Sequence, residues 1–330
     1  MAAMNTANGM CGLVWINGVN FKNLREAGNA YGPWADIVPN SVNFDFESTA
    51  IKYDKGVPTE GYEFPYNTAQ SVFIWSGAPE AQPLSVNEIK RWLENEGKGK
   101  FAYANVTDFT GSLFVRTIFH ALAGGAEVFT SPLTANAAME ARYMQKSPAV
   151  WQFLNDIKPY LYQDPATGGA IYPQTHAEVQ QLMWSNLTLL DCAYDVNLAG
   201  RQIDLGNLPP HTVAYVLEGQ PGTIANTNYV AIPINAQSRA ASMAVGNFIG
   251  SLEAMFTRNE PEGWGALQSY NPKVPHIEGA GWNTAFNYLE NHVSPAYPSV
   301  EKLAEFRLGE LHSTYVERIE ADWHTFVGFA

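Results

Sequence analysis

The chain has 330 residues, and its 46% hydrophobic content is enough for a sizeable core in one large or two medium domains. Its 32 acidic and 19 basic residues give a formal net charge of −13, which disfavours nucleic acid or an anionic membrane surface as a partner. No apolar run approaches the roughly 20 residues that span a bilayer, and the first ten residues lack the basic and apolar regions of a signal peptide.

The first third of the chain predicts strand–helix alternation. Residues 13–16 read as a short buried strand, 20–27 as a helix, and 28–68 as a long structured loop rich in Gly, Pro, Asn and Tyr. Residues 69–75 read as a second strand. Residues 85–95 predict a helix with a serine cap, a glutamate three positions later and an apolar stripe.

The alternation continues to the end of the chain. Further predicted strands are 101–104, 187–193, 213–217 and 228–233. Further predicted helices are 112–123, 134–146, 148–158, 175–184, 196–204, 238–249 and 301–326, the last with Gly309 as a point of interruption. Residues 159–174 read as a loop. This order predicts an α/β fold with largely parallel sheets.

Common catalytic and nucleotide-binding motifs are absent from the sequence. They include the P-loop, the G-x-G-x-x-G dinucleotide-binding motif, the H-E-x-x-H zinc motif and the G-x-S-x-G nucleophile elbow of hydrolases. The histidines are scattered, and Cys11 and Cys192 are expected as unpaired, buried thiols. Two acidic pairs, Glu60 with Glu63 and Asp191 with Asp195, could form a catalytic dyad, although a solvated loop or a helix cap is the favoured reading. We therefore expect no metal, no cofactor and no enzyme activity.

The stretch N-V-T-D-F-T-G-S (105–112), directly before an apolar helix, has two readings. Its hydroxyls and its acid can cap the helix, because each can accept a hydrogen bond from an unpaired N–H of the first turn. Alternatively, the free N–H groups and the positive end of the helix dipole can hold a polar or anionic ligand.

Five separated segments resemble the extracellular solute-binding proteins of ABC importers, in the YnjB-like branch related to thiamine- and polyamine-type binders. They are W-I-N-G-V-N-F (15–21), V-P-T-E-G-Y-E-F-P-Y-N-T-A-Q (57–70), D-F-T-G-S-L-F (108–114), P-A-V-W-Q-F-L-N-D-I-K-P-Y-L-Y (148–162) and G-T-I-A-N-T-N-Y-V-A-I-P-I-N-A (222–236). They occur in this order over nearly the whole chain. Relative to the family the chain opens almost at W-I-N-G, so a truncated or shortened first lobe is expected.

The resemblance implies a two-lobed, type II periplasmic-binding-protein-like fold with two crossover segments and a ligand cleft between the lobes. Lobe 1 would comprise residues 1–106 and 234–330, and lobe 2 would comprise residues 107–233. The implied function is capture of a small polar solute and its delivery to an ABC permease, in the periplasm or outside the cell. A monomer is expected.

The candidate ligand-binding residues lie at strand–helix junctions and turns, the usual ligand edge of an open α/β sheet. They are Trp15, Asn17, Gly18, Tyr66, Asn67, Gln70, Asp108, Phe109, Thr110, Gly111, Ser112, Tyr194, Asp195, Asn197, Thr223 and Asn226. Each has a structural alternative: Trp15 can belong to the core, Tyr66 and Asn67 to a turn, and Asp195 can be an N-cap.

The chemistry of the solute stays open at this stage. Aromatic faces and acids suit a cation, whereas helix N-termini suit an anion, so a zwitterion or a phosphorylated or aminated molecule would satisfy both. Two other functions also stay open: a two-domain α/β enzyme that uses Asp108 or Asp195 in the same cleft, and a non-transporting receptor with this fold.

Overall fold

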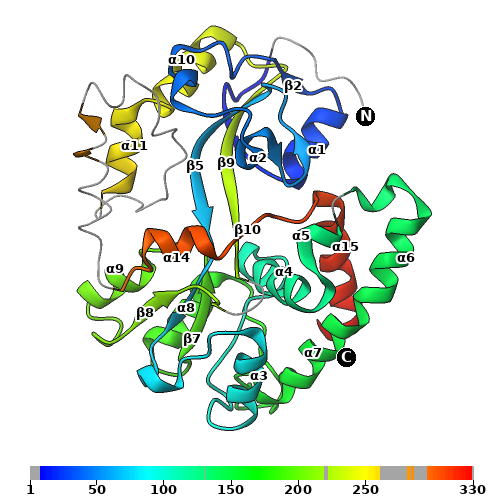
Figure 1. Cartoon of the computed structure of the whole chain (residues 1–330), viewed down its shortest axis with the longest axis vertical. Helices are drawn as coiled ribbons and strands as arrows, with labels where there is room; N and C mark the ends of the chain where they lie inside the picture. Colours follow the sequence, from blue (N-terminus) through cyan, green and yellow to red (C-terminus); the bar gives the residue numbers. More distant parts are fainter. Residues whose placement is uncertain are drawn as a thin grey trace. The chain divides into compact units, whose positions relative to one another are not determined.

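The structure is a computed structural model that describes residues 8–129, 131–218, 222–260, 281–282, 284–285 and 296–328. The chain forms two compact units. The first unit is Met1–Ala69 with Asn226–Val293, and the second is Gln70–Ala225 with Ser294–Ala330. Two paired strands, β5 (Glu63–Gln70) and β9 (Thr223–Pro233), run side by side and each contributes residues to both units (Figure 1).

This division differs from the lobes expected from the sequence. The chain passes into the second unit at Gln70 within β5, not after residue 106. It returns at Asn226 within β9, not after residue 233. The reason lies in strand pairing, because β6 (Val72–Trp75), which directly follows β5, pairs with strands of the second unit.

The first unit is built on β9. Two short strands, β1 (Val14–Ile16) and β2 (Ala30–Tyr31), pair with it in antiparallel orientation, with Val14 opposite Ala231 and Ala30 opposite Pro233. The other elements are α1 (Val19–Glu26), η1 (Pro39–Asn43), α2 (Thr49–Lys52), β3 (Tyr53–Asp54), β4 (Val57–Pro58), α10 (Arg239–Ile249) and α11 (Leu252–Asn259). Its core gathers aromatic rings, among them Trp34, Phe44 and Phe64, against the aliphatic side of β9.

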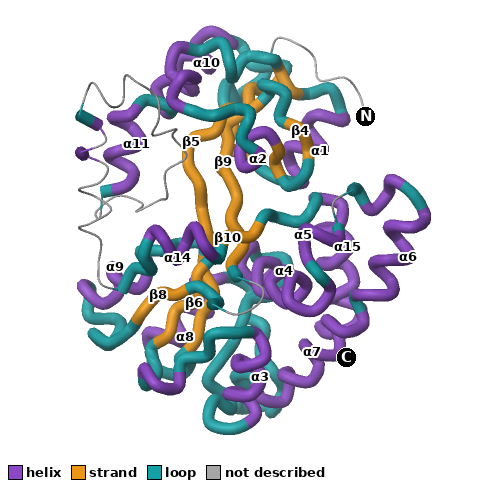
Figure 2. The backbone as a smooth tube through the Cα atoms, in the orientation of Figure 1, coloured by secondary structure: helices purple, strands orange, loops and turns teal. Residues whose placement is uncertain are grey.

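The second unit has β6 at the centre of its three-stranded sheet, between β7 (Leu190–Ala193) and β8 (Val213–Tyr215). Strands β6 and β8 are labelled in Figure 2, and β7 is labelled in Figure 1. A two-residue strand, β10 (Arg307–Leu308), pairs with the start of β9. The helices are η2 (Pro79–Ala81), α3 (Val86–Glu94), α4 (Phe109–Ala123), α5 (Gly125–Val128), η3 (Leu133–Ala135), α6 (Ala137–Lys146), α7 (Pro148–Ile157), η4 (Lys158–Tyr160), α8 (His176–Trp184), α9 (Leu198–Asp204), α14 (Val300–Glu305), α15 (Ser313–Trp323) and the π-helical η5 (His324–Gly328).

The predicted mixture of helices and strands is confirmed, but the prediction of largely parallel sheets is wrong for the pairs just described. β1 and β2 run antiparallel to β9, and β7 and β8 run antiparallel to β6, whereas β10 is parallel to β9. Alternation along the chain does not set strand direction here, because sheet neighbours such as β6 and β7 are separated by more than one helix.

Most predicted helices are confirmed, with different bounds in several cases. Helix α3 has its serine cap, since the Ser85 hydroxyl accepts the N–H of Glu88. The C-terminal helix is interrupted as expected, although a strand and a turn separate α14 from α15. The strand predicted at 101–104 is wrong: this buried segment makes one isolated bridge, Phe101 to Leu190.

Two further findings concern the cysteines and the length of the helices. The two cysteines are free, but Cys11 is exposed, so the expectation of a buried thiol holds only for Cys192. No helix within the described ranges has the length and apolar character to cross a membrane.

Candidate functional site

A row of asparagines joins three adjacent strands in the first unit. Asn17, just after β1, donates from Nδ2 to Oδ1 of Asn228 on β9 at 3.4 Å. Asn228 in turn donates from Nδ2 to Oδ1 of Asn67 on β5 at 3.2 Å. Two of the three were predicted as ligand contacts, and the structure brings them together through Asn228.

Asn226 lies two positions before Asn228 on β9, so the two side chains project to the same face of the strand. Its side chain is only 7% exposed, and within the described residues neither its Nδ2 nor its Oδ1 has a hydrogen-bond partner. A buried amide without partners is costly, because it has lost its bonds to water and gained none in return.

Trp15 projects away from the core. Its side chain is 61% exposed, and its ring meets the ring of Tyr66 edge to face at a centroid distance of 6.3 Å. The alternative in which Trp15 is a core residue is therefore wrong. The turn alternative for Tyr66 and Asn67 is wrong too, since both lie within β5.

Gly18 is explained by backbone geometry. It precedes α1 with φ at 58°, a conformation that favours glycine, and its N–H donates to the Asp54 carboxylate. A Cβ at this position would lie 2.5 Å from Cδ of Lys55. Gly18 therefore lets the chain turn directly from β1 into α1.

In the second unit, Asp108 is the N-cap of α4. Its Oδ1 accepts the N–H of Thr110 at 2.8 Å and the hydroxyl of Thr110 at 2.7 Å, and its Oδ2 accepts the N–H of His176 at 3.0 Å. Burial opposes ionisation of Asp108, but these hydrogen bonds outweigh it and lower the pKa. The capping reading of the D-F-T-G segment is confirmed for Asp108.

Ser112 and Gly111 are buried inside the second unit. The Ser112 hydroxyl donates to Oε1 of Glu320 at 2.5 Å and accepts from Arg116. Arg116 also forms an ion pair with Glu310 at 3.0 Å, with 1% and 4% of the two side chains exposed. Gly111 lies so close to the preceding segment that a Cβ would meet the carbonyl oxygens of Ala104 and Asn105 at 2.2 and 2.3 Å.

An aromatic pair lies at the start of α4. The Phe109 side chain is 44% exposed, and its ring lies 4.8 Å from the ring of Tyr194. The Tyr194 hydroxyl accepts a bond of 3.1 Å from Arg116, so the ring is held in place while Phe109 offers a partly exposed face.

The remaining predicted residues form bonds within the second unit. Asp195 accepts the N–H of Asn197 at 3.0 Å and forms an ion pair with Arg201. Asn197, not Asp195, is the N-cap of α9. Gln70 and Thr223 are buried side by side, with Nε2 of Gln70 donating to the Thr223 hydroxyl at 3.0 Å.

In the two acidic pairs considered as catalytic dyads, the carboxylates lie in different environments. Glu60 forms an ion pair with Arg25, while Glu63 is fully buried and burial raises its pKa well above the usual range. Asp191 pairs with His176 at 2.9 Å. Within the described ranges, no three His, Cys, Asp or Glu side chains are grouped as a metal site would need.

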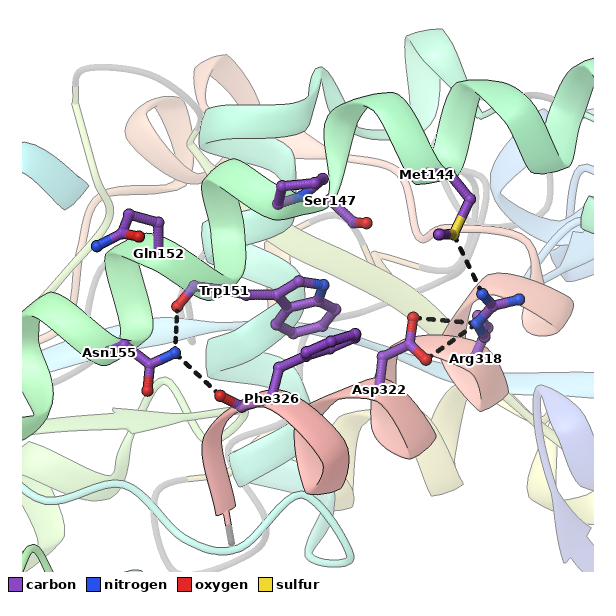
Figure 3. A pocket seen from close by; sticks show the side chains of 9 residues that line it. Met144, Ser147, Trp151, Gln152, Asn155, Arg318, Asp322 and Phe326 are labelled. Carbon is purple, nitrogen blue, oxygen red and sulfur yellow. Dashed lines mark hydrogen bonds and ion pairs between the residues drawn. The ribbon is translucent and has the colours of Figure 1, made fainter. Parts of the chain in front are cut away.

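A pocket of about 290 Å³ lies in the second unit and contains none of the predicted residues (Figure 3). The rings of Trp151 and Phe326 stack in it at 5.9 Å, and the Asn155 amide donates to the backbone oxygens of both residues. It is lined by Met144, Ser147, Pro148, Trp151, Gln152, Asn155, Arg318, Asp322 and Phe326.

Two residues that hydrogen-bond to predicted site residues, Asn228 and His176, were not predicted from the sequence. The alternation N-T-N on a predicted strand could have indicated Asn228, because residues two apart share a face. His176 carried no such signal, because its contact with Asp108 joins residues that are far apart in the sequence.

The chain is similar to the protein YnjB of Escherichia coli strain K12, with 27% identity over 323 residues, 98% of this chain and 76% of YnjB. No protein-family model matches the sequence.

Solved structures with the same fold include an ABC transporter protein from Clostridium perfringens (TM-score 0.60, 14% identity, 98% of this chain and 84% of that one). A second is the periplasmic binding protein AfuA of Actinobacillus pleuropneumoniae with bound fructose-6-phosphate (0.62, 13%, 98% and 84%). A third is iron-bound HitA of Pseudomonas aeruginosa (0.59, 10%, 95% and 83%). The predicted resemblance is thus confirmed: the chain is similar in sequence to YnjB and shares the type II fold of the periplasmic binding proteins among these structures.

Proposed function

We propose that the chain is the solute-binding component of an ABC transporter. It captures a small polar solute in the periplasm or outside the cell and delivers it, as a monomer, to a membrane permease, without catalysing a reaction. The fold and the similarity to YnjB support this role. The ligands named for AfuA and HitA, a sugar phosphate and iron, differ so much that the solute must be inferred from the residues of this chain.

Two groups of residues carry the binding in this proposal. In the first unit they are the amides of Asn17, Asn67 and Asn226 and the rings of Trp15 and Tyr66. In the second unit they are the start of α4, with Asp108, Phe109 and Thr110, and the neighbouring Tyr194. Both groups combine aromatic faces with fixed polar atoms, the usual composition of small-molecule sites.

The observation that carries the proposal is the buried amide of Asn226, which has no hydrogen-bond partner in the part of the chain that the structure describes. Burial of such a group contributes nothing favourable to the free energy of folding. A solute that presents an acceptor beside a donor would complete both of its bonds. The side-chain amides of Asn17, Asn228 and Asn67 are already hydrogen-bonded to one another. These bonds hold the three side chains in place beside the contact with Asn226.

The first experiment identifies the solute. Protein purified under native conditions is denatured, and the released small molecules are analysed by mass spectrometry against a denatured blank. We expect one polar compound in near-stoichiometric amount. Conversion of that compound into a product by the purified protein would instead indicate the enzyme alternative.

The second experiment tests Asn226 with the recovered solute. Asn226→Ala should weaken binding at least 10-fold without lowering the free energy of unfolding, since the amide that is removed has no partner within the described residues. Asn247→Ala is the matched control: its amide oxygen accepts the backbone N–H of Asn40 at 2.7 Å in the same unit, so this variant loses stability and keeps its affinity. Wild-type affinity in Asn226→Ala would refute the assignment.

A further inference from the structure

Arg258, on α11, is a partly buried cation in the first unit with a fixed position. Its Nη2 donates to the backbone oxygen of Tyr66 at 2.8 Å, and its Nη1 donates to that of Ile249 at 3.0 Å. The guanidinium carbon also lies 5.6 Å from the centre of the Tyr66 ring. Two carbonyl oxygens and an aromatic face therefore hold the guanidinium in one place.

This guanidinium has hydrogen-bonding capacity left over. It has five N–H donors, and the two carbonyl bonds use two of them. Within the described residues no carboxylate lies within ion-pair distance of Arg258. By contrast, Arg116, Arg201 and Arg318 each have a carboxylate partner.

The surroundings make the missing partner costly. Burial lowers the pKa of Arg258 to about 10, and the nearby Tyr66 opposes this shift only in part. The charge has thus been taken out of water, and no acid among the described residues compensates for it. A buried charge is normally paired.

Arg258 also adjoins one residue of the candidate site, Tyr66, which in turn contacts a second. It lies over the ring of Tyr66, and Tyr66 meets the exposed ring of Trp15 edge to face. A solute in contact with Trp15 and Tyr66 would therefore be within reach of a cation that has donors to spare. Since the whole chain carries a net charge of −13, an anion is held here only by a local contact of this kind.

Building on the proposed function, we infer that the solute is a small organic anion whose carboxylate or phosphate group binds the guanidinium of Arg258 and whose body lies against Trp15 and Tyr66. A guanidinium offers paired donors that match two oxygens of either group. The shared chemistry is thus an oxyanion attached to a body that can lie on an aromatic ring.

The test uses two probes, inorganic phosphate and benzoate, titrated calorimetrically into ligand-free protein at constant ionic strength. Both should bind wild type, and Arg258→Gln should weaken both at least 10-fold. Arg239→Gln is the matched control, because Arg239 also lies over a tyrosine ring, that of Tyr31, and donates to a backbone oxygen in the same unit. This control should bind as wild type does.

Two additions keep the test decisive if Arg258→Gln folds poorly. Arg258→Lys keeps the charge but loses the paired donors, so it should bind more weakly than wild type and more tightly than Arg258→Gln. Trp15→Ala should weaken benzoate and leave phosphate unchanged, which separates the oxyanion contact from the ring contact.

Failure to bind either probe, or equal binding by wild type and Arg258→Gln, would overturn the inference. So would a co-purified solute that has no anionic group, and in that case the proposed transport function would stand. The absence of any bound or bindable solute would instead count against the proposed function itself.

Discussion

Oδ2 of Asp108 accepts the backbone N–H of His176 at 3.0 Å, so one carboxylate ties the first turn of α8 to the first turn of α4. The same carboxylate caps α4 through Thr110. His176 in turn holds Asp191 of β7 through its ring. Two helices and a strand are thus joined at the segment that the sequence identified as a ligand edge.

Asp108→Ala should lower the free energy of unfolding by about 2 kcal/mol, because a helix cap is lost and the N–H of His176 is left without its acceptor. Asp108→Asn keeps one acceptor oxygen and should cost about 1 kcal/mol. Urea unfolding of the variants and wild type measures both values. Equal stability of wild type and Asp108→Ala would show that the tie between α4 and α8 contributes nothing.

Gly111→Ala should cost about 2–3 kcal/mol, since its Cβ would lie 2.2 Å from the backbone oxygen of Ala104, which cannot rotate away as a side chain could. Gly309→Ala is the matched control, because a Cβ there meets nothing within 4 Å, and its effect should stay within about 0.5 kcal/mol. Thermal and urea unfolding compare the two. A Gly111→Ala variant as stable as wild type would mean that α4 can move away from the preceding segment.

His176 should make the stability of the protein depend on pH. Burial opposes its protonation, but the ion pair and hydrogen bond with Asp191, together with the charges of Asp108 and Asp195, outweigh burial and raise the pKa above 6.5. The stabilisation is therefore complete below pH 6.5 and is lost as the pH rises through the folded-state pKa. His176→Gln should remove this part of the pH dependence, measured as the free energy of unfolding at a series of pH values from 5 to about 9. An unchanged slope in the variant would exclude the ion pair as its source.

The sequence predicted the helices better than the strands, and the comparison of α3 with β5 shows why. A serine cap and an apolar stripe are local signals, and both survive in α3. β5 was missed because its sequence, E-F-P-Y-N-T-A-Q, contains Pro and Asn, which are rare in strands, and no alternation of polar and apolar residues. Its strand conformation depends on pairing with β9, more than 150 residues away, and no local pattern reports such a partner.

The candidate site shows the same limit. Residue types at a strand–helix junction led to Asn17, and residue types before a predicted strand and in a turn led to Asn67 and Asn226. Only the structure shows that Asn228 links the first two. Ser112 looked like a ligand contact because it sits near a helix start. Its actual partners, Arg116 and Glu320, lie on α4 and α15, and the second of these is distant in sequence.

Ser112→Ala should therefore act mainly on folding. Removal of the hydroxyl takes one bond from each of two charged groups in a buried network, which should cost about 1–3 kcal/mol of unfolding free energy. Glu320→Gln keeps an oxygen acceptor for Ser112 and should cost less. The free energy of unfolding and the dissociation constant of the recovered solute are measured for each variant. If Ser112→Ala is as stable as wild type but binds the solute more weakly, Ser112 contacts the ligand.

Trp15→Ala should have the opposite profile. The ring is 61% exposed, so its removal should change the free energy of unfolding by no more than about 0.5 kcal/mol. The affinity for the recovered solute should fall at least 10-fold, about 1.4 kcal/mol, because the ring and its neighbour Tyr66 lose their contact with the ligand. Trp34→Ala is the matched control in the same unit: that ring is fully buried against Phe64, and its loss should cost about 3–5 kcal/mol while the folded protein keeps its affinity. The melting temperature and the dissociation constant are measured for both variants. If Trp15→Ala has a lower melting temperature than wild type but the same dissociation constant, the Trp15 ring does not contact the solute.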